Sequence, residues 1–79
     1  MQLNVLLFAS YAEAFGTSSV GVTLPEGASV QELLDTVRRM ASGNGLPPAA
    51  VAVNQEYALP SHRLSPGDEI AIIPPVAGG

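Results

Sequence analysis

Apolar side chains recur at every second position over residues 1–9, the pattern of a β-strand. The set that would share one face consists of Leu3, Val5, Leu7 and Ala9. Because a strand points alternate residues to opposite faces, this set predicts a buried face. The alternation resumes over residues 20–24, after turn-forming residues 16–19. We expect two strands joined by a short connection. The connection has room for a helical turn over Tyr11 to Phe15.

The clearest helix is predicted from residue 30 onward. Its apolar residues recur at the spacing of one helical face: Val30, Leu33, Leu34, Val37 and Met40. Ser29 is a natural N-cap, and Glu32, three residues later, completes a capping box. Gly43 is expected to close the helix, because glycine readily adopts the left-handed conformation found after a last helical turn.

Further strands are predicted in the second half of the chain. Residues 51–53 mark a short strand, and residues 56–59 return beside it after the polar pair at 54–55. The sequence Ser-Pro-Gly-Asp at 65–68 is typical of a turn. It leads into a last strand over residues 69–73.

This order of elements predicts an α+β fold, in which one main helix crosses one face of a mixed sheet. The positions expected to face the helix are Leu3, Val5, Leu7, Ile70 and Ile72. The positions left on the opposite face, with nothing in the chain to cover them, are Leu6, Phe8, Ala71 and Ile73. We expect one domain over residues 1–74, followed by a flexible tail over 75–79.

Composition narrows the possible functions. The 79 residues are 47% hydrophobic and 13% charged, which is typical of a packed globular domain. The absence of cysteine and the single histidine, His62, argue against a metal site. The net charge is -4, and the cations are three arginines with no lysine, which argues against nucleic-acid binding and favours a basic protein as partner. No apolar run is long enough to span a membrane and no signal peptide is evident, so we expect a cytoplasmic protein.

The last residues carry the strongest functional signal. After Ile73 the chain reads PPVAGG. Consecutive prolines favour an extended conformation and cannot continue a central strand, so this end is expected to project from the sheet. Residues 75–79 span at most about 17 Å when extended, enough to carry a terminal carboxylate into another protein's active site. Glycines would leave that carboxylate unobstructed, although a merely frayed end would look the same.

The whole chain resembles the MoaD family, the small subunits of molybdopterin synthase. These have the β-grasp (ubiquitin-like) fold and are related to the sulfur carrier ThiS. The resemblance is carried by VLLFA at Val5 to Ala9, LPEGASVQELL at Leu24 to Leu34, AVNQEY at Ala52 to Tyr57 and LSPGDEIAIIPPVAGG at Leu64 to Gly79. The last segment distinguishes this family from ubiquitin-like proteins in general.

The resemblance implies that the α-carboxylate of Gly79 is the reactive group. An E1-like, MoeB-like adenylyltransferase would use ATP to adenylate it, and a sulfurtransferase would convert it to a thiocarboxylate. The tail residues Pro75, Val76, Ala77 and Gly78 would insert into a MoaE-like large subunit. There the sulfur would pass to cyclic pyranopterin monophosphate during molybdenum cofactor biosynthesis. The chain itself would be non-catalytic, without a permanent cofactor, and part of a heterotetramer.

Phe8, Tyr57 and Ile73 are predicted to form the apolar patch that docks a partner. The alternative is that short connections fold over and bury them. Other functions also stay open: a sulfur carrier for thiazole and thiamine synthesis, tungsten cofactor assembly or tRNA thiolation; a ubiquitin-like modifier joined to other proteins through Gly79; or a plain binding module. His62 is expected to be an exposed surface histidine.

Overall fold

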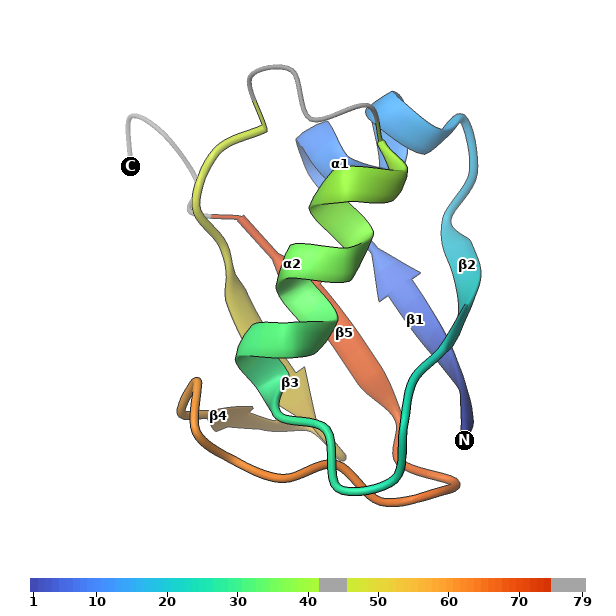
Figure 1. The fold of residues 1–79 in the computed structure, drawn as a ribbon. Helices are drawn as coiled ribbons and strands as arrows, with labels where there is room; N and C mark the ends of the chain where they lie inside the picture. The colour runs from blue at the N-terminus through green and yellow to red at the C-terminus, as the bar shows by residue number, and fades with distance from the viewer. Residues whose placement is uncertain (42–45, 75–79) are drawn as a thin grey trace.

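A mixed sheet forms one layer of the protein and helix α2 forms the other (Figure 1). The structure is a computed structural model, and it describes residues 1–41 and 46–74. The strands are β1 (Gln2–Leu7), β2 (Ser19–Thr23), β3 (Ala50–Val53), β4 (Glu56–Ala58) and β5 (Ile70–Ile73), and the helices are α1 (Ala9–Phe15) and α2 (Val30–Met40).

The strands lie in the order β2-β1-β5-β3-β4. The central neighbours β1 and β5 are parallel, whereas β1–β2, β3–β5 and β3–β4 are antiparallel. This is the β-grasp arrangement, and the predicted α+β fold with one main helix on a mixed sheet is confirmed. Neither helix among the described residues has the length and apolar character needed to cross a membrane.

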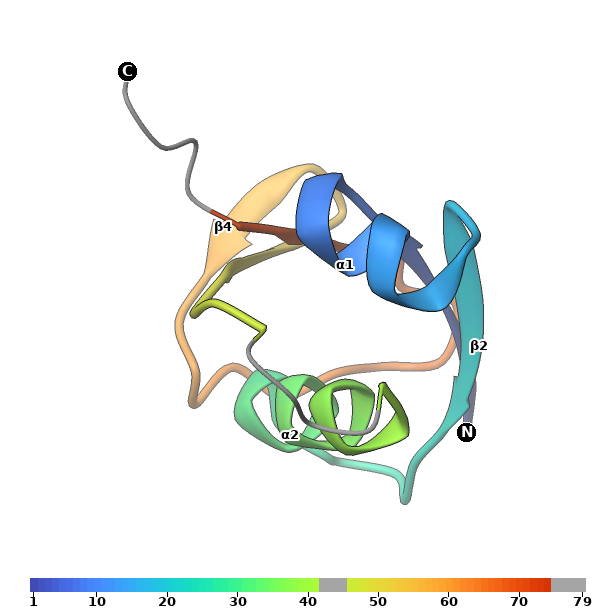
Figure 2. The ribbon, with the colours of Figure 1, turned by 90° about the horizontal axis from the view of Figure 1, so that it is seen from above.

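The core lies between the sheet and α2 (Figure 2). All five strand positions predicted to face the helix are at most 2% exposed. From α2, Val30, Leu33 and Val37 pack into the same core. Burial of one such side chain stabilises the fold by roughly 1.5–3 kcal/mol. Leu34 is only partly buried, and Met40, the last residue of the helix, is 46% exposed.

Helix α1 corrects the prediction that the first strand continues to residue 9. The strand ends at Leu7, and Ala9 has φ +52, which is incompatible with an extended strand and turns the chain into α1. The helix covers the end of the core at which β1 finishes (Figures 1 and 2). Its Tyr11 is fully buried and donates a hydrogen bond of 2.6 Å from its hydroxyl to the carbonyl oxygen of Pro47. Gly16, at φ +70, ends α1.

The amino end of α2 has the predicted capping box. The Ser29 hydroxyl accepts from the Glu32 amide at 3.2 Å, and the Glu32 carboxylate accepts from the Ser29 amide at 3.0 Å. The next free amides of the first turn are satisfied by a segment distant in sequence: Val30 N–H donates to the His62 carbonyl and Gln31 N–H to that of Pro60. The predicted closure at Gly43 lies outside the described residues.

The turn between β3 and β4 is tied to the start of β5. Asn54 and Gln55 both have positive φ, 52 and 71, as a tight hairpin turn requires. The Asn54 side chain donates to Asp68 Oδ1 at 3.0 Å and accepts from the Glu69 amide at 2.9 Å. The Ser65 amide also donates to the Asp68 carboxylate. These hydrogen bonds, from Ser65 first and then Asn54, lower the pKa of Asp68.

Candidate docking face beside the last strand

A row of side chains crosses the sheet on the face opposite α2. The strand register pairs Leu6 with Ala71, Ala71 with Ala52, and Ala52 with Tyr57. Paired residues in neighbouring strands point to the same side of a sheet, so the row runs from β1 through β5 and β3 to β4. Ile73 lies two residues along β5 from Ala71 and so belongs to the same face.

The row borders an open hollow of about 370 Å³. We call the surface that lines this hollow the docking face. Its described lining consists of Leu6, Phe8, Ala52, Gln55, Tyr57, Glu69, Ala71 and Ile73. All three residues predicted for partner contact are therefore brought together. Phe8 is 47% and Tyr57 73% exposed, while Ile73 is partly buried. Their role in binding a partner stays a prediction, but the described connections do not cover them.

The docking face adjoins the point at which the chain leaves the sheet. Ile73 ends β5 and lines the hollow, and Pro74 directly after it is buried. The predicted reactive residue Gly79 and the predicted insertion residues Pro75, Val76, Ala77 and Gly78 lie outside the described residues. The described structure therefore supplies their anchor, which is the central strand of the sheet.

The rim of the docking face contains residues that the sequence reasoning did not assign to it. Glu69 and Gln55 line the hollow at its polar end, and Glu69 is the charged residue among the described lining residues. Its backbone is held on both sides by Asn54, whose amide donates to the Glu69 carbonyl at 2.8 Å. Residue spacing along the chain gave no signal for Gln55 or Glu69, whose placement at this hollow depends on how the strands pair.

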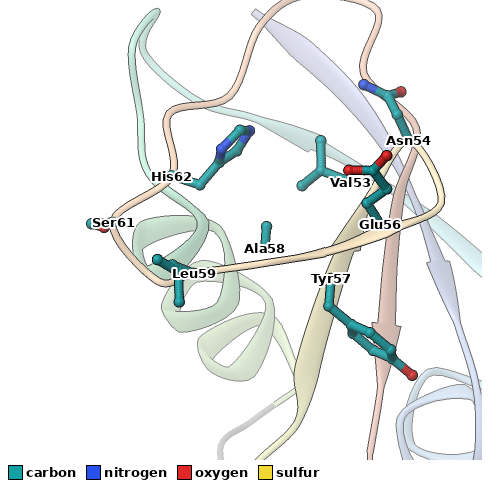
Figure 3. A pocket seen from close by; sticks show the side chains of 8 residues that line it. All are labelled: Val53, Asn54, Glu56, Tyr57, Ala58, Leu59, Ser61 and His62. Carbon is teal, nitrogen blue, oxygen red and sulfur yellow. The ribbon is translucent and has the colours of Figure 1, made fainter.

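A larger open hollow of about 620 Å³ lies on the other side of β4 (Figure 3). Its lining includes Val53, Ala58, Leu59 and the exposed His62. Tyr57 lines both hollows, and its ring points away from Val53 and His62 (Figure 3). Among residues 1–41 and 46–74, no three His, Asp or Glu side chains gather as metal ligands would.

The fold and this face define a β-grasp domain with an exposed apolar surface next to its last strand. The family model described as "ThiS family" matches residues 5–79 of the chain. A molybdopterin synthase sulfur carrier subunit from Chlamydomonas reinhardtii is 37% identical, and the alignment covers 100% of both chains. The chain belongs to the ThiS family.

Two solved structures have the same fold. Small archaeal modifier protein 1 of Haloferax volcanii superposes with a TM-score of 0.79 at 29% identity, covering 95% of this chain and 98% of that one. A second structure is a complex of subunits 1 and 2 of the molybdopterin-converting factor from Helicobacter pylori. It matches with a TM-score of 0.67 and 22% identity over 100% of both chains, which supports the fold alone.

Proposed function

We propose that this chain is the sulfur carrier subunit of a molybdopterin synthase, with the α-carboxylate of Gly79 as its working group. The observation that carries the proposal is the 37% identity to a sulfur carrier subunit of that enzyme over the full length of both chains. In this proposal residues 1–74 are the body that docks and residues 75–79 are the tail that reacts.

The chemistry requires activation because a carboxylate is a poor electrophile. Attack of a Gly79 carboxylate oxygen on the α-phosphorus of ATP would release pyrophosphate and form an acyl-adenylate. A sulfur nucleophile supplied by a sulfurtransferase would then displace AMP, leaving a thiocarboxylate. In the synthase this sulfur would pass to cyclic pyranopterin monophosphate. ATP is bound by the activating enzyme, and the catalytic side chains belong to the partners.

The docking face gives the proposal a place for the large subunit. An apolar hollow beside the end of β5 would bind a partner and at the same time aim the tail into it. The Helicobacter pylori structure is a complex of subunits 1 and 2 of the molybdopterin-converting factor. We expect the same pairing here, in a heterotetramer of two small and two large subunits.

Restoration of molybdopterin synthesis in cells that lack their own small subunit tests the proposal. The full chain should restore synthesis, and a variant without Gly79 should not. Mass spectrometry of the full chain from those cells should show a mass gain that matches exchange of one oxygen for sulfur at Gly79. If the shortened variant restores synthesis as well as the full chain does, the carboxylate of Gly79 is not the working group.

A second candidate is a protein modifier that forms an isopeptide bond through Gly79. The 29% identity to small archaeal modifier protein 1 is the observation that favours it. Under this function the chain should be recovered from cells attached to lysines of other proteins. A sulfur carrier for thiazole, tungsten cofactor or tRNA thiolation would instead show the thiocarboxylate but fail to support molybdopterin synthesis.

A further inference from the structure

The positive charge of the chain resides entirely in guanidinium groups and the amino terminus. The three basic side chains are Arg38, Arg39 and Arg63, and the 79 residues include neither lysine nor cysteine. Lysine is among the commonest residues of soluble domains. Lysine amines and cysteine thiols are also the side chains that most readily accept an acyl group.

The contacts of these arginines do not require a guanidinium. The described hydrogen bond of Arg63 runs from Nη1 to the Gly27 carbonyl at 2.8 Å, and that of Arg39 from Nη2 to the Thr36 hydroxyl at 3.3 Å. Arg38 donates from Nη2 to the Leu46 carbonyl at 3.1 Å. Each is a single bond to one oxygen, which an ammonium also makes, rather than a bidentate fork. What arginine adds is chemical inertness, because a guanidinium group stays protonated in proteins and is therefore non-nucleophilic.

The α-amino group of Met1 is the remaining amine. It donates a hydrogen bond of 2.6 Å to the Leu24 carbonyl oxygen in a partly buried position. This hydrogen bond and the partial burial hold the nitrogen against the body of the protein, where the approach of a bulky acyl-adenylate is restricted. Serine and threonine hydroxyls need an adjacent base to act as nucleophiles.

We infer that this chain is an acyl donor that does not accept its own acyl group. The inference rests on the proposed activation of Gly79. An amine on a second copy would attack the acyl-adenylate carbonyl, form an amide C–N bond, expel AMP with the electrons of the broken C–O bond and release a proton to solvent. Without such an amine, the activated tail survives until it meets a sulfur donor or an amine of a different protein. Any conjugate through Gly79 then stops at one copy of the chain.

Matched arginine-to-lysine variants test the inference. Wild type, Arg63→Lys, Arg39→Lys and the amine-free control Arg63→Gln are incubated with the ATP-dependent activating enzyme and ATP, without a sulfur donor. Mass spectrometry measures both the AMP adduct at Gly79 and amide-linked dimers. We expect the AMP adduct in all four proteins, and at least tenfold more dimer in the two lysine variants than in wild type or Arg63→Gln.

Two results overturn the inference: wild type that forms as much dimer as the lysine variants, including dimer joined at Met1, or lysine variants that form none. Absence of the AMP adduct would instead count against the proposed function. A second measurement distinguishes failure of the inference from failure of the proposed function. The same four proteins are prepared with a C-terminal thioester, which is electrophilic without the activating enzyme. At mildly alkaline pH we again expect more dimer from the two lysine variants than from wild type or Arg63→Gln. If the wild-type thioester forms as much dimer as the lysine variants, the inference is overturned whether or not the proposed activation of Gly79 is correct.

Discussion

The hydroxyl of Tyr11 donates a 2.6 Å hydrogen bond to the carbonyl oxygen of Pro47, 36 residues further along the chain. The bond joins α1 to the segment that follows α2, at the end of the core nearest the start of α1. Arg38 binds the neighbouring Leu46 carbonyl, so both helices hold this segment. Burial raises the pKa of Tyr11, opposed in part by the charge of Arg38.

Tyr11→Phe should lower the free energy of unfolding by about 1–2 kcal/mol, because it leaves the Pro47 carbonyl without this donor. Urea titration followed by circular dichroism measures the loss. The exposed Tyr57→Phe is the matched control and should change stability little. Because the folded-state pKa of Tyr11 is raised above 10.0, its contribution is complete below that pH and is lost as pH rises through the folded-state pKa. Equal stability of Tyr11→Phe and wild type would show that the bond contributes nothing.

The docking face predicts a position-dependent effect of charge on partner binding. Phe8→Asp should weaken binding to the large subunit at least tenfold, because a carboxylate would be desolvated at the centre of an apolar contact. Met40→Asp is a close control, since Met40 is 46% and Phe8 47% exposed, but Met40 ends α2 and does not line the hollow. Calorimetric titration measures both. Equal weakening by the two variants would place the interface elsewhere.

Glu69 should contribute an electrostatic part of the same contact. The carboxylate lies at the rim of an apolar hollow, so a basic residue of the partner is its expected counterpart. Glu69→Gln should reduce affinity several-fold at low ionic strength, with the difference shrinking as salt is added. Glu56→Gln, in the other hollow, is the control. A salt-independent loss, or none, would argue against charge pairing.

Asn54 combines two roles that substitution can separate. Asn54→Gly keeps the left-handed backbone at φ +52 but removes the hydrogen bonds to Asp68 and Glu69, at a cost of about 1–2 kcal/mol. Asn54→Ala loses the same bonds and also strains the backbone, so it should cost roughly 1 kcal/mol more. Thermal or urea unfolding compares the two. A more stable alanine variant would contradict the reading of this turn.

The Asn54 variants should also differ from wild type in acid. The folded-state pKa of Asp68 is lowered, so its carboxylate contributes stability that is present above the unfolded-state pKa and is lost as pH falls through the folded-state value. Asn54→Gly removes one cause of that lowering, and its stability should therefore depend less on pH below about 4. Parallel acid dependence in both proteins would mean that the Asn54 side chain does not contribute to the lowered pKa of Asp68.

Much of the fold could be read from the spacing of apolar residues. Leu3, Val5 and Leu7 are buried because their period of two matches a strand with one covered face, and Ser29 with Glu32 marks the helix start by local chemistry alone. The end of β1 could not be found in this way. Phe8 and Ala9 continue the apolar pattern, which gives no sign of the positive φ with which Ala9 turns the chain into α1.

The apolar residues of the candidate site could be predicted from the sequence, whereas its charged residue could not. Phe8, Tyr57 and Ile73 followed from counting which apolar positions the single main helix leaves uncovered. Glu69 becomes part of the face through the pairing of β5 with β3, a contact between distant segments that residue spacing does not encode. The hydrogen bond between Tyr11 and Pro47 likewise joins segments that are distant in the chain, so residue spacing does not predict it.

The position of β5 bears on how the protein is made. This strand lies between β1 and β3 in the sheet but follows both in the chain. The β1–β2 and β3–β4 hairpins therefore have no common neighbour until residues 70–73 leave the ribosome, and the core cannot close around Ile70 and Ile72 before then. A nascent chain interrupted upstream of these residues would expose its apolar faces to chaperones and proteases, so cells would have little opportunity to accumulate a folded carrier without its last strand.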